Sequence, residues 1–304
     1  MNRDEIRACL TGPFPSIRMP FHEDGSMDTG SLRHQIDFII AAGGKTILLT
    51  AGDSHYMCLS DEEIAEATRV TCQHTAGRAM IVAADRWCST SRAIEFAQFA
   101  RNIGADVVMA QPPNWGPSCT PQTLADHYRA VSEHLPVMIV TNVFSTQGAD
   151  FGLETVRLTL DQCPDVVAIK DDLCGDFARR LSLLAHERCA VFAGGLKVNH
   201  INMWPYGCDG YLSTFMSFKP DIARRYWSAI EARDLEAARA IIRDYDMPFF
   251  DFISKFTGGW NAGLHGTLEV FGIAKRWRRK PYYSLDDAEM EELREFLRVQ
   301  WLLA

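Results

Sequence analysis

Short apolar runs alternate with amphipathic segments of helical period along most of this 304-residue chain. Runs of this kind are typical of strands that are buried on both faces, and the segments between them repeat their apolar residues every three or four positions. Eight such strand–helix units predict parallel pairing and a (β/α)8 TIM barrel. The expected strands are residues 16–19, 46–49, 80–83, 107–110, 137–141, 166–170, 190–193 and 211–213.

The segments between these runs carry the signals of helix ends. Ser60 stands before three acidic residues, Pro121 occupies a first helical position, and Gly104 follows an expected helix end. Beyond residue 234 the pattern is wholly helical, with helices expected at 235–245, 249–257 and 286–299. The sequence therefore predicts a barrel domain at residues 1–232 and a C-terminal helical extension at residues 233–304. An open doubly wound sheet is disfavoured in its dinucleotide-binding version, because no Gly-x-Gly-x-x-Gly follows the first strand.

Charge and cysteine content narrow the classes of function. The net charge of −8 argues against a nucleic-acid-binding surface. The nine cysteines are scattered without a Cys-x-x-Cys pair, which predicts reduced thiols and no metal site. No apolar run approaches the roughly 20 residues that span a bilayer, and the N-terminus has no apolar signal region. We expect a cytoplasmic protein without a membrane segment, metal or cofactor.

The run 166–169 ends in Lys170, Asp171 and Asp172. A lysine at the carboxyl end of a buried strand lies partly in apolar surroundings, and desolvation lowers the pKa of an amine. An amine in that state can attack a carbonyl group at neutral pH and form a Schiff base. The active site of a barrel lies at the carboxyl ends of its strands, so Lys170 is a candidate nucleophile.

Other strand ends add polar and glycine residues to the same mouth. Thr50, Ala51 and Gly52 follow the second strand, and such a turn offers a hydroxyl and backbone N–H groups to a small carboxylate. Asn142 follows the fifth strand, and the Gly194-Gly195 pair after the seventh allows a ligand to approach the backbone closely.

The order and spacing of these residues resemble those of the dihydrodipicolinate synthase / N-acetylneuraminate lyase family of class I aldolases and lyases. The matching positions run from Pro15 and Pro20, through residues 50–54, Asn142, 169–171 and 193–195, to residues 210–213. The resemblance implies a homotetramer built as a dimer of dimers, and a lysine that forms an imine with a 2-oxo acid such as pyruvate. It assigns catalytic roles to Lys170, Thr50 and Thr141, and substrate binding to Ala51, Gly52, Asn142, Gly194, Gly195 and Leu212.

Three departures from the family pattern concern the second substrate and proton transfer. Thr141 stands where the family has a proton-relaying tyrosine, Thr146 where dihydrodipicolinate synthases have a carboxylate-binding arginine, and Asn114 where they have a tyrosine from across the dimer. We therefore expect no true dihydrodipicolinate synthase activity, and a far end of the pocket that has lost its cation. Arg86 or Arg276 could supply that charge instead.

Several residues could replace the missing tyrosine as acid or base. His55, Tyr56 and Asp172 are the local candidates, and the sequence does not choose among them. Trp115, Trp204, Phe144 and Phe215 would make the mouth apolar. The leading prediction is a Schiff-base-forming lyase or aldolase that acts on a small 2-oxo acid through Lys170. The alternatives are a dehydratase of 2-oxo-3-deoxy sugar acids and a non-catalytic family member that binds a carboxylate.

Overall fold

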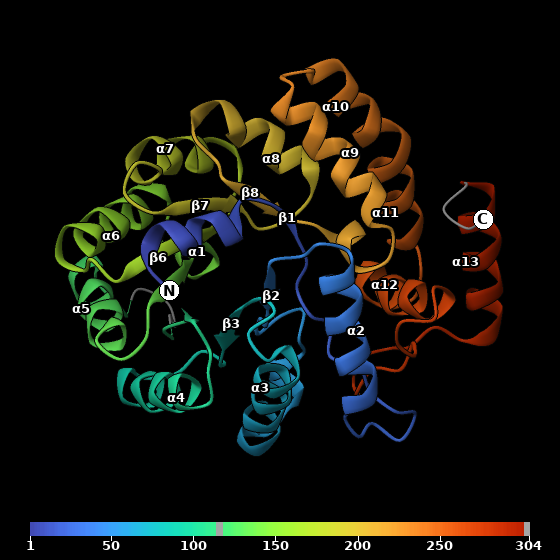
Figure 1. Cartoon of the computed structure of the whole chain (residues 1–304), viewed down its shortest axis with the longest axis horizontal. Coiled ribbons are helices and arrows are strands. Elements are labelled where there is room, and N and C mark those ends of the chain that lie inside the picture. Colours follow the sequence, from blue (N-terminus) through green and yellow to red (C-terminus); the bar gives the residue numbers. More distant parts are fainter. Residues whose placement is uncertain (114–117, 301–304) are drawn as a thin grey trace.

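The computed structural model describes residues 1–113 and 118–300, and within them eight parallel strands form a nearly closed barrel surrounded by helices (Figure 1). The order around the sheet is β1-β8-β7-β6-β5-β4-β3-β2, and β1 approaches β2 only through a bridge between Ser16 and Leu48. The predicted (β/α)8 TIM barrel with a C-terminal helical extension is confirmed. The strands are β1 Gly12–Phe14, β2 Thr46–Leu48, β3 Met80–Ala84, β4 Val107–Ala110, β5 Val137–Val140, β6 Val166–Asp171, β7 Ala190–Ala193 and β8 Gly210–Leu212.

Helix α1 (Arg3–Leu10) precedes β1 and lies across one end of the barrel in Figure 1. The outer layer consists of α2 Thr29–Ala41, α3 Asp61–Thr75, α4 Thr90–Asn102, α5 Pro121–Ser132, α6 Ala149–Gln162, α7 Gly175–Ala185, α8 Lys197–Met203 and α9 Pro220–Glu231. Short 3-10 turns are η1 Tyr56–Cys58, η2 Thr141–Phe144, η3 Trp204–Tyr206 and η4 Thr214–Ser217.

The predicted helix starts agree with the capping contacts. At α3 the Ser60 hydroxyl accepts a hydrogen bond from the Glu63 N–H at 3.3 Å, and the Glu63 carboxylate accepts one from the Ser60 N–H at 2.9 Å. These reciprocal bonds satisfy two donors that the first turn would otherwise leave unpaired. Pro121 opens α5 at a position where its missing N–H costs nothing.

The first strand lies earlier in the chain than predicted. The sequence predicts a strand at 16–19, whereas β1 spans Gly12–Phe14 and pairs with β8 from Gly12↔Gly210 to Phe14↔Leu212. The next residue, Pro15, has no N–H to continue the ladder, so the strand ends there. As a consequence, residues 16–18 lie beyond the carboxyl end of β1, at the mouth of the barrel.

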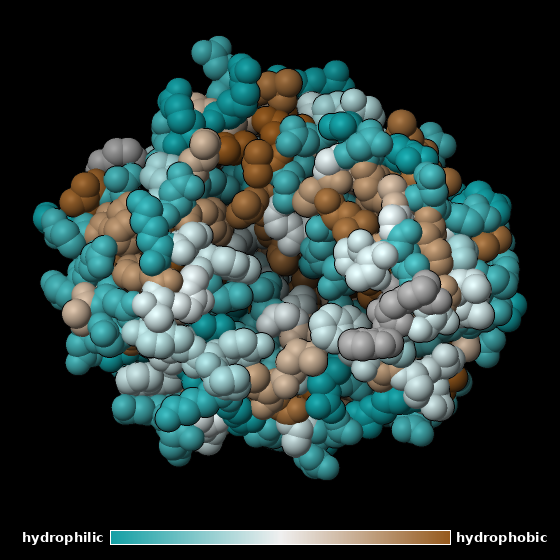
Figure 2. Space-filling model, turned by 180° about the vertical axis from the view of Figure 1, so that it is seen from behind, coloured by the Kyte–Doolittle hydropathy of each residue, from teal (hydrophilic) through white to brown (hydrophobic). Residues whose placement is uncertain are grey.

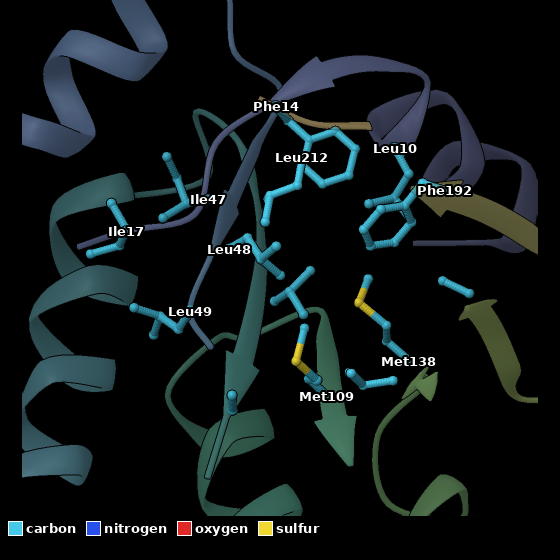
Figure 3. Close-up of a cluster of buried hydrophobic side chains, with 14 of the residues drawn as sticks. Leu10, Phe14, Ile17, Ile47, Leu48, Leu49, Met109, Met138, Phe192 and Leu212 are labelled. Carbon is cyan, nitrogen blue, oxygen red and sulfur yellow. The ribbon is translucent and has the colours of Figure 1, made fainter. Parts of the chain in front are cut away.

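Apolar side chains fill the interior of the barrel. Figure 3 shows Phe14, Leu48, Met138 and Phe192 turned toward one another from different strands, and the rings of Phe14 and Phe192 meet edge to face at 4.9 Å. All four side chains are at most 2% exposed. The barrel is therefore a packed core and not a pore, and any ligand must bind above this layer.

The C-terminal helices gather against one side of the barrel (Figure 1) and are α10 Leu235–Ile241, the π-helix η5 Ile242–Asp246, α11 Met247–Ile253, α12 Gly259–Val270 and α13 Asp287–Val299. Helix α12 was not predicted from the sequence. Phe249 packs on Phe218 with ring centroids 5.3 Å apart, so the apolar core continues from the barrel into the extension. The domain boundary near residue 232 stays a prediction. Within residues 1–113 and 118–300, no helix combines the length and apolarity needed to cross a membrane.

Candidate active site

A cavity of about 460 Å³ opens above the barrel core, at the carboxyl ends of the strands. Figure 2 views the molecule from the side opposite to Figure 1 and shows a hollow near the middle of that face. The floor includes Met109 and Leu212, which also belong to the apolar cluster of Figure 3. The predicted site residues Thr50, Ala51, Gly52, Asn142, Lys170, Gly194, Gly195 and Leu212 all line this cavity.

Lys170 projects into the cavity from β6 and forms an ion pair with Asp172. Its Nζ lies 2.5 Å from both carboxylate oxygens of Asp172, and the lysine is only 7% exposed. Side chains two positions apart on an extended strand point to the same side, so the amine and this carboxylate face the cavity together. Of the three candidate replacements for the missing tyrosine, Asp172 is the one that contacts Lys170.

Asp171 points away from the cavity and organises the backbone beneath it. Its carboxylate accepts hydrogen bonds from the Thr141 hydroxyl at 2.9 Å and from the N–H groups of Leu173 and Cys174 at 3.3 and 2.9 Å. Burial raises the pKa of Asp171, although these donors oppose the shift.

The structure places Thr141 at the buried start of η2 rather than in the cavity wall. Its side chain is fully buried, and it is absent from the residues that line the cavity. The hydroxyl donates to Asp171 and accepts the Asp172 N–H at 2.8 Å. Both hydrogen bonds hold the strand end that carries Lys170 and Asp172.

The turn after β2 presents unpaired backbone donors to the cavity. The Thr50 hydroxyl accepts the Asp53 N–H at 3.0 Å, and the Thr50 N–H donates to the Ser54 hydroxyl at 3.1 Å. Within the described part of the chain, the N–H groups of Ala51 and Gly52 make no hydrogen bond. A carboxylate placed here would meet two backbone donors and a hydroxyl, which supports the expected use of this turn.

His55, expected as a possible acid or base, does not line the cavity. The residue adopts a left-handed conformation with φ 55° and is 3% exposed, stacked between His265 at 4.9 Å and Tyr282 at 5.1 Å. Burial lowers the pKa of His55 to about 3, and the nearby Arg278 guanidinium adds to the effect. The ring is therefore neutral at pH 7 and packed against the C-terminal extension.

The structure likewise keeps Tyr56 apart from the residues that line the cavity. It is fully buried and does not line the cavity. Burial raises the pKa of its phenol far above the usual range. Its side chain contributes to packing beneath the turn after β2.

Gly194 allows Asp172 to reach the lysine. A Cβ added at Gly194 would overlap the Asp172 carboxylate and would lie 2.7 Å from the Asp171 carbonyl oxygen. The Gly194 N–H also donates to that carbonyl at 2.6 Å. Glycine at this position therefore keeps open the space in which the Lys170–Asp172 pair forms.

Two amide side chains leave acceptor oxygens buried at the site. Asn142 Oδ1 and Gln111 Oε1 have no hydrogen-bond partner within the described residues, and both residues line the cavity. Buried acceptors of this kind are costly unless a donor reaches them. Substrate hydroxyl groups would be suitable donors. Gln111 was not identified from the sequence, because it follows the end of β4 outside the motifs considered.

The aromatic residues at the mouth differ from those predicted. Phe144 and Phe215 are buried in the core, and Trp204, like them, is absent from the cavity lining. Phe250 of α11 and Trp260 of α12 line the cavity instead, together with Ser254. Trp115 and Asn114 lie outside the described residues. The C-terminal extension therefore supplies part of the cavity wall. The sequence did not indicate this, because helix α12 was not predicted.

Arg18 gives the cavity a cation that the sequence did not predict. Its Nη1 donates to Asp53 Oδ1 at 3.2 Å and to Asn261 Oδ1 at 3.0 Å, and its guanidinium lies 5.4 Å from the Trp260 ring centroid. Arg86 and Arg276, which the sequence suggested as sources of this charge, do not line the cavity. Arg86 pairs with Asp61 and Arg276 with Glu269 and Asp287.

Asp53 holds Arg18 in place as an ionised partner. Its Oδ2 accepts the Ser16 hydroxyl at 2.5 Å. Burial acts to raise the pKa of Asp53, but the Arg18 charge and the Ser16 hydrogen bond outweigh burial and lower it. Within the described residues, no cluster of three or more His, Cys, Asp or Glu side chains is arranged to hold a metal ion.

The model of the dihydrodipicolinate synthetase family matches residues 10–300. The chain belongs to this family. A 4-hydroxy-tetrahydrodipicolinate synthase of Nitrosospira multiformis is 31% identical over 239 residues, which cover 77% of this chain and 78% of that protein. A probable 5-dehydro-4-deoxyglucarate dehydratase of a Bradyrhizobium species is 25% identical over 279 residues, which cover 90% and 87%.

The solved structure of N-acetylneuraminate lyase from Mycoplasma synoviae shares the fold. Its TM-score is 0.81 at 20% identity, with 97% of this chain and 99% of that chain covered. The resemblance to the dihydrodipicolinate synthase / N-acetylneuraminate lyase family is thereby confirmed. Members of this family are lyases, aldolases or dehydratases.

Proposed function

We propose that this chain is a Schiff-base-forming lyase or aldolase that acts on a 2-oxo acid through Lys170. The observation that carries the proposal is the Lys170 amine in the wall of the cavity, with both oxygens of Asp172 2.5 Å away. The turn after β2 adds unpaired N–H groups for the substrate carboxylate. Amine, proton acceptor and carboxylate site therefore occupy one cavity.

The chemistry begins with transfer of a proton from the Lys170 ammonium to Asp172. The free amine attacks the C2 carbonyl carbon, forming a C–N bond and a carbinolamine. Asp172 then returns the proton to the carbinolamine hydroxyl, which leaves as water and gives a protonated imine. This imine accepts the electron pair of a bond broken further along the substrate, so cleavage, condensation and dehydration share one intermediate.

Asp172 takes the place of the family's tyrosine in this proposal. The phenol is replaced by Thr141, whose hydroxyl is occupied by Asp171 and the Asp172 N–H. A positioned acid–base contributes about 10²–10⁴ in rate, so the proposal requires such a group beside the lysine. Because Thr141 and Thr146 replace groups of the lysine-biosynthetic reaction, we propose that the chain is not a true dihydrodipicolinate synthase.

Dehydration of a 2-oxo-3-deoxy sugar acid is the second candidate reaction. The Bradyrhizobium relative named as a dehydratase matches over 90% of this chain. The unpaired oxygens of Asn142 and Gln111 also suit a substrate that carries hydroxyl groups. A non-catalytic member that binds a carboxylate stays the alternative from another class.

Borohydride trapping with a panel of 2-oxo acids tests the proposal. The panel comprises pyruvate, 2-oxobutyrate and 2-oxo-3-deoxy sugar acids, each incubated with borohydride and examined by intact mass. We expect one added acid per chain, with the loss of one oxygen. Absence of an adduct with every acid would refute imine chemistry and favour the non-catalytic alternative. For acids that react, product analysis without borohydride distinguishes cleavage from dehydration.

We also propose that the protein is cytoplasmic and assembles as a dimer of dimers. The family resemblance supports this assembly, and residues 112–118 correspond to the segment that makes the tight dimer contact in the family. Residues 114–117 of that segment lie outside the described residues. Sedimentation at micromolar concentration should return a species larger than the 34.2 kDa chain, and a single species of that mass would contradict the proposal.

A further inference from the structure

We infer that Leu196 determines the substrate selectivity of the cavity, so that the preferred substrates are 2-oxo acids that carry an uncharged apolar group, aliphatic or aromatic, beyond the carbons next to the imine. The inference rests on the proposed imine chemistry of Lys170 and names a substrate class for that site. It concerns a residue that neither the sequence motifs nor the family resemblance marked.

The cavity has a polar side and an apolar side, with Lys170 between them. The strand order places β6, which carries Lys170, between β5 and β7. On the side of β4 and β5, Gln111 and Asn142 present buried oxygens without a hydrogen-bond partner among the described residues. On the side of β7, β8 and α11, the described lining residues besides two glycines are uncharged: Leu196, Leu212, Thr214, Phe250 and Ser254. A substrate hydroxyl would be satisfied on the first side, and a carbon side chain on the second.

Phe250 extends the apolar side from the C-terminal helices to Leu196. Asp246 Oδ1 lies 2.5 Å from Nζ of Lys197, which directly follows Leu196. Phe250 comes four residues after Asp246, and residues four apart on a helix are neighbours on one face. Leu196 and Phe250 therefore flank the same contact between α8 and the C-terminal helices, and both line the cavity.

Leu196 has a backbone conformation that residues with a side chain rarely adopt. Its φ is 58° and its ψ is 142°, close to a region that is essentially confined to glycine. Such a conformation persists only where the surroundings fix it. Here the chain is fixed on both sides of Leu196, because the Gly194 N–H donates to the Asp171 carbonyl at 2.6 Å and Lys197 pairs with Asp246.

The Leu196 side chain does not serve the core. Among the described residues, it belongs neither to the apolar core nor to the partly buried side chains that pack against the core, and it is 36% exposed. Glycine, which already occupies the two preceding positions, would relieve the backbone and expose no apolar side chain. Strain and exposed apolar area are both costs, and an apolar ligand that covers this leucine would offset them.

Matched pairs of 2-oxo acids test the inference. We would compare 2-oxoheptanoate with 5-methoxy-2-oxopentanoate, in which an ether oxygen replaces one methylene. The second pair is 2-oxo-4-phenylbutanoate and its 4-pyridyl analogue, at a pH where the pyridine is neutral. The readout is the half-saturating concentration for borohydride trapping. An apolar wall predicts that the apolar member of each pair saturates at roughly four- to tenfold lower concentration. Equal values within both pairs would overturn the inference.

Leu196→Gly and Leu196→Asn should both remove this preference while leaving pyruvate within about twofold, because pyruvate has no carbon beyond C3. Val198→Ala is the matched control. Val198 is an apolar residue of 41% exposure in the first turn of α8 and does not line the cavity, so this variant should retain the full preference. An equal change for both members of each pair in the Leu196 variants would assign the residue to the general shape of the cavity and overturn the inference.

Urea unfolding tests the strain on which the inference depends. Leu196→Gly should unfold at a higher urea concentration than Leu196→Ala, because only glycine adopts this conformation without penalty. This order is the reverse of the one found in ordinary helices and strands, where glycine is the less stable residue. An alanine variant more stable than the glycine variant would show that the position is unstrained, and would remove the reason to assign the leucine to a ligand.

Two further measurements separate this inference from the proposed function. Calorimetric titration of the same acid pairs onto Lys170→Ala measures binding without an imine. Apolar preference there, without trapping in the unmodified protein, would refute the proposed function alone, and equal affinity for both members would refute the role of Leu196. Sedimentation of Leu196→Gly gives the other control: loss of the larger species with an unchanged preference would place the leucine at a subunit contact and overturn the inference.

Discussion

The part of the chain that the structure describes contains two buried lysine–aspartate pairs with the same separation and different surroundings. In the first, Lys170 Nζ lies 2.5 Å from Asp172 on β6 and its neighbouring turn. In the second, Lys197 Nζ lies 2.5 Å from Asp246, which joins α8 to the π-helix η5. The first pair lines the cavity, whereas Lys197 is 1% exposed and packs on the Phe215 ring at 4.3 Å.

This comparison teaches that burial of an amine does not by itself identify a nucleophile. Burial lowers the pKa of Lys197 although Asp246 opposes the shift, so this amine is desolvated and yet closed off from substrate. Lys170 differs because a cavity stands in front of it. Lys197 begins α8 and is 1% exposed, so a lysine at a helix start can also face the interior.

Replacement of Lys170 should have the largest effect. Lys170→Ala removes the amine that forms the imine, so borohydride trapping with pyruvate or a related 2-oxo acid should give no adduct by intact mass. Lys197→Met is the matched control, and it should still trap the acid wherever it folds. An adduct in Lys170→Ala that disappears in Lys197→Met would reverse the assignment of the two lysines.

Asp172→Asn should slow imine formation by about 10²–10⁴, because the amide cannot accept the proton of Lys170. Rapid-quench borohydride trapping across a pH series gives the rate. Asp176→Asn, at an exposed position in the first turn of α7, should leave the rate unchanged. A rate within twofold of the unmodified protein in Asp172→Asn would remove this residue from the mechanism.

The Lys197–Asp246 pair, which is closed off from the cavity, should contribute to stability and not to catalysis. Lys197→Met leaves the Asp246 carboxylate buried without its partner, and breaking a buried pair in this way costs about 3–5 kcal/mol. Urea unfolding measures the loss. The double variant Lys197→Met with Asp246→Leu should recover most of the stability, because both charges are then gone. If Lys197→Met were as stable as the unmodified protein, the Lys197–Asp246 pair would not be closed off from solvent.

Acid should weaken the region where the C-terminal extension meets the turn after β2. The folded-state pKa of His55 is about 3, below its unfolded value near 6.5, so the unfolded chain binds the proton first. The neutral His55 ring therefore contributes stability above pH 6.5, and this contribution is lost as the pH falls toward 3. At pH 5 the loss amounts to about 2 kcal/mol.

His265, which stacks on His55, also has its pKa lowered by burial. His265→Phe keeps the packing and removes one titrating ring. The fall in unfolding free energy between pH 7 and pH 5, measured in urea, should therefore be smaller in His265→Phe than in the unmodified protein. An identical fall in both proteins would contradict a role for this ring in acid sensitivity.

The part of the site that the sequence predicted lies at strand ends set by hydrophobic periodicity. Lys170 and the Thr50 turn are examples, since each follows an apolar run whose end fixes its position. The burial of His55 was not foreseen, because its left-handed backbone turns the ring into the core and no local pattern shows this. The hydrogen bonds of Thr141 were not foreseen because its partners, Asp171 and the Asp172 N–H, lie some 30 residues away in sequence.

Arg18 escaped prediction for two physical reasons. Pro15 ends β1 early, so a residue expected inside a strand lies at the barrel mouth instead. Its partner Asn261 is 243 positions away, on the helix α12 that the sequence did not predict. The glycines of α12 weaken the helical signal, yet they are needed for packing, since a Cβ at Gly263 would lie 2.6 Å from the Ile253 Cβ.

The late position of α12 has a consequence for synthesis on the ribosome. Chains emerge from the N-terminus, so the strands, Lys170 and Asp172 are complete before Trp260 and Asn261 have been added. During that interval the nascent barrel has its reactive amine but lacks one wall of its cavity. A nascent chain that folds early would thus hold Arg18 with Asp53 alone, and the contacts of Arg18 with Asn261 and Trp260 would be acquired last.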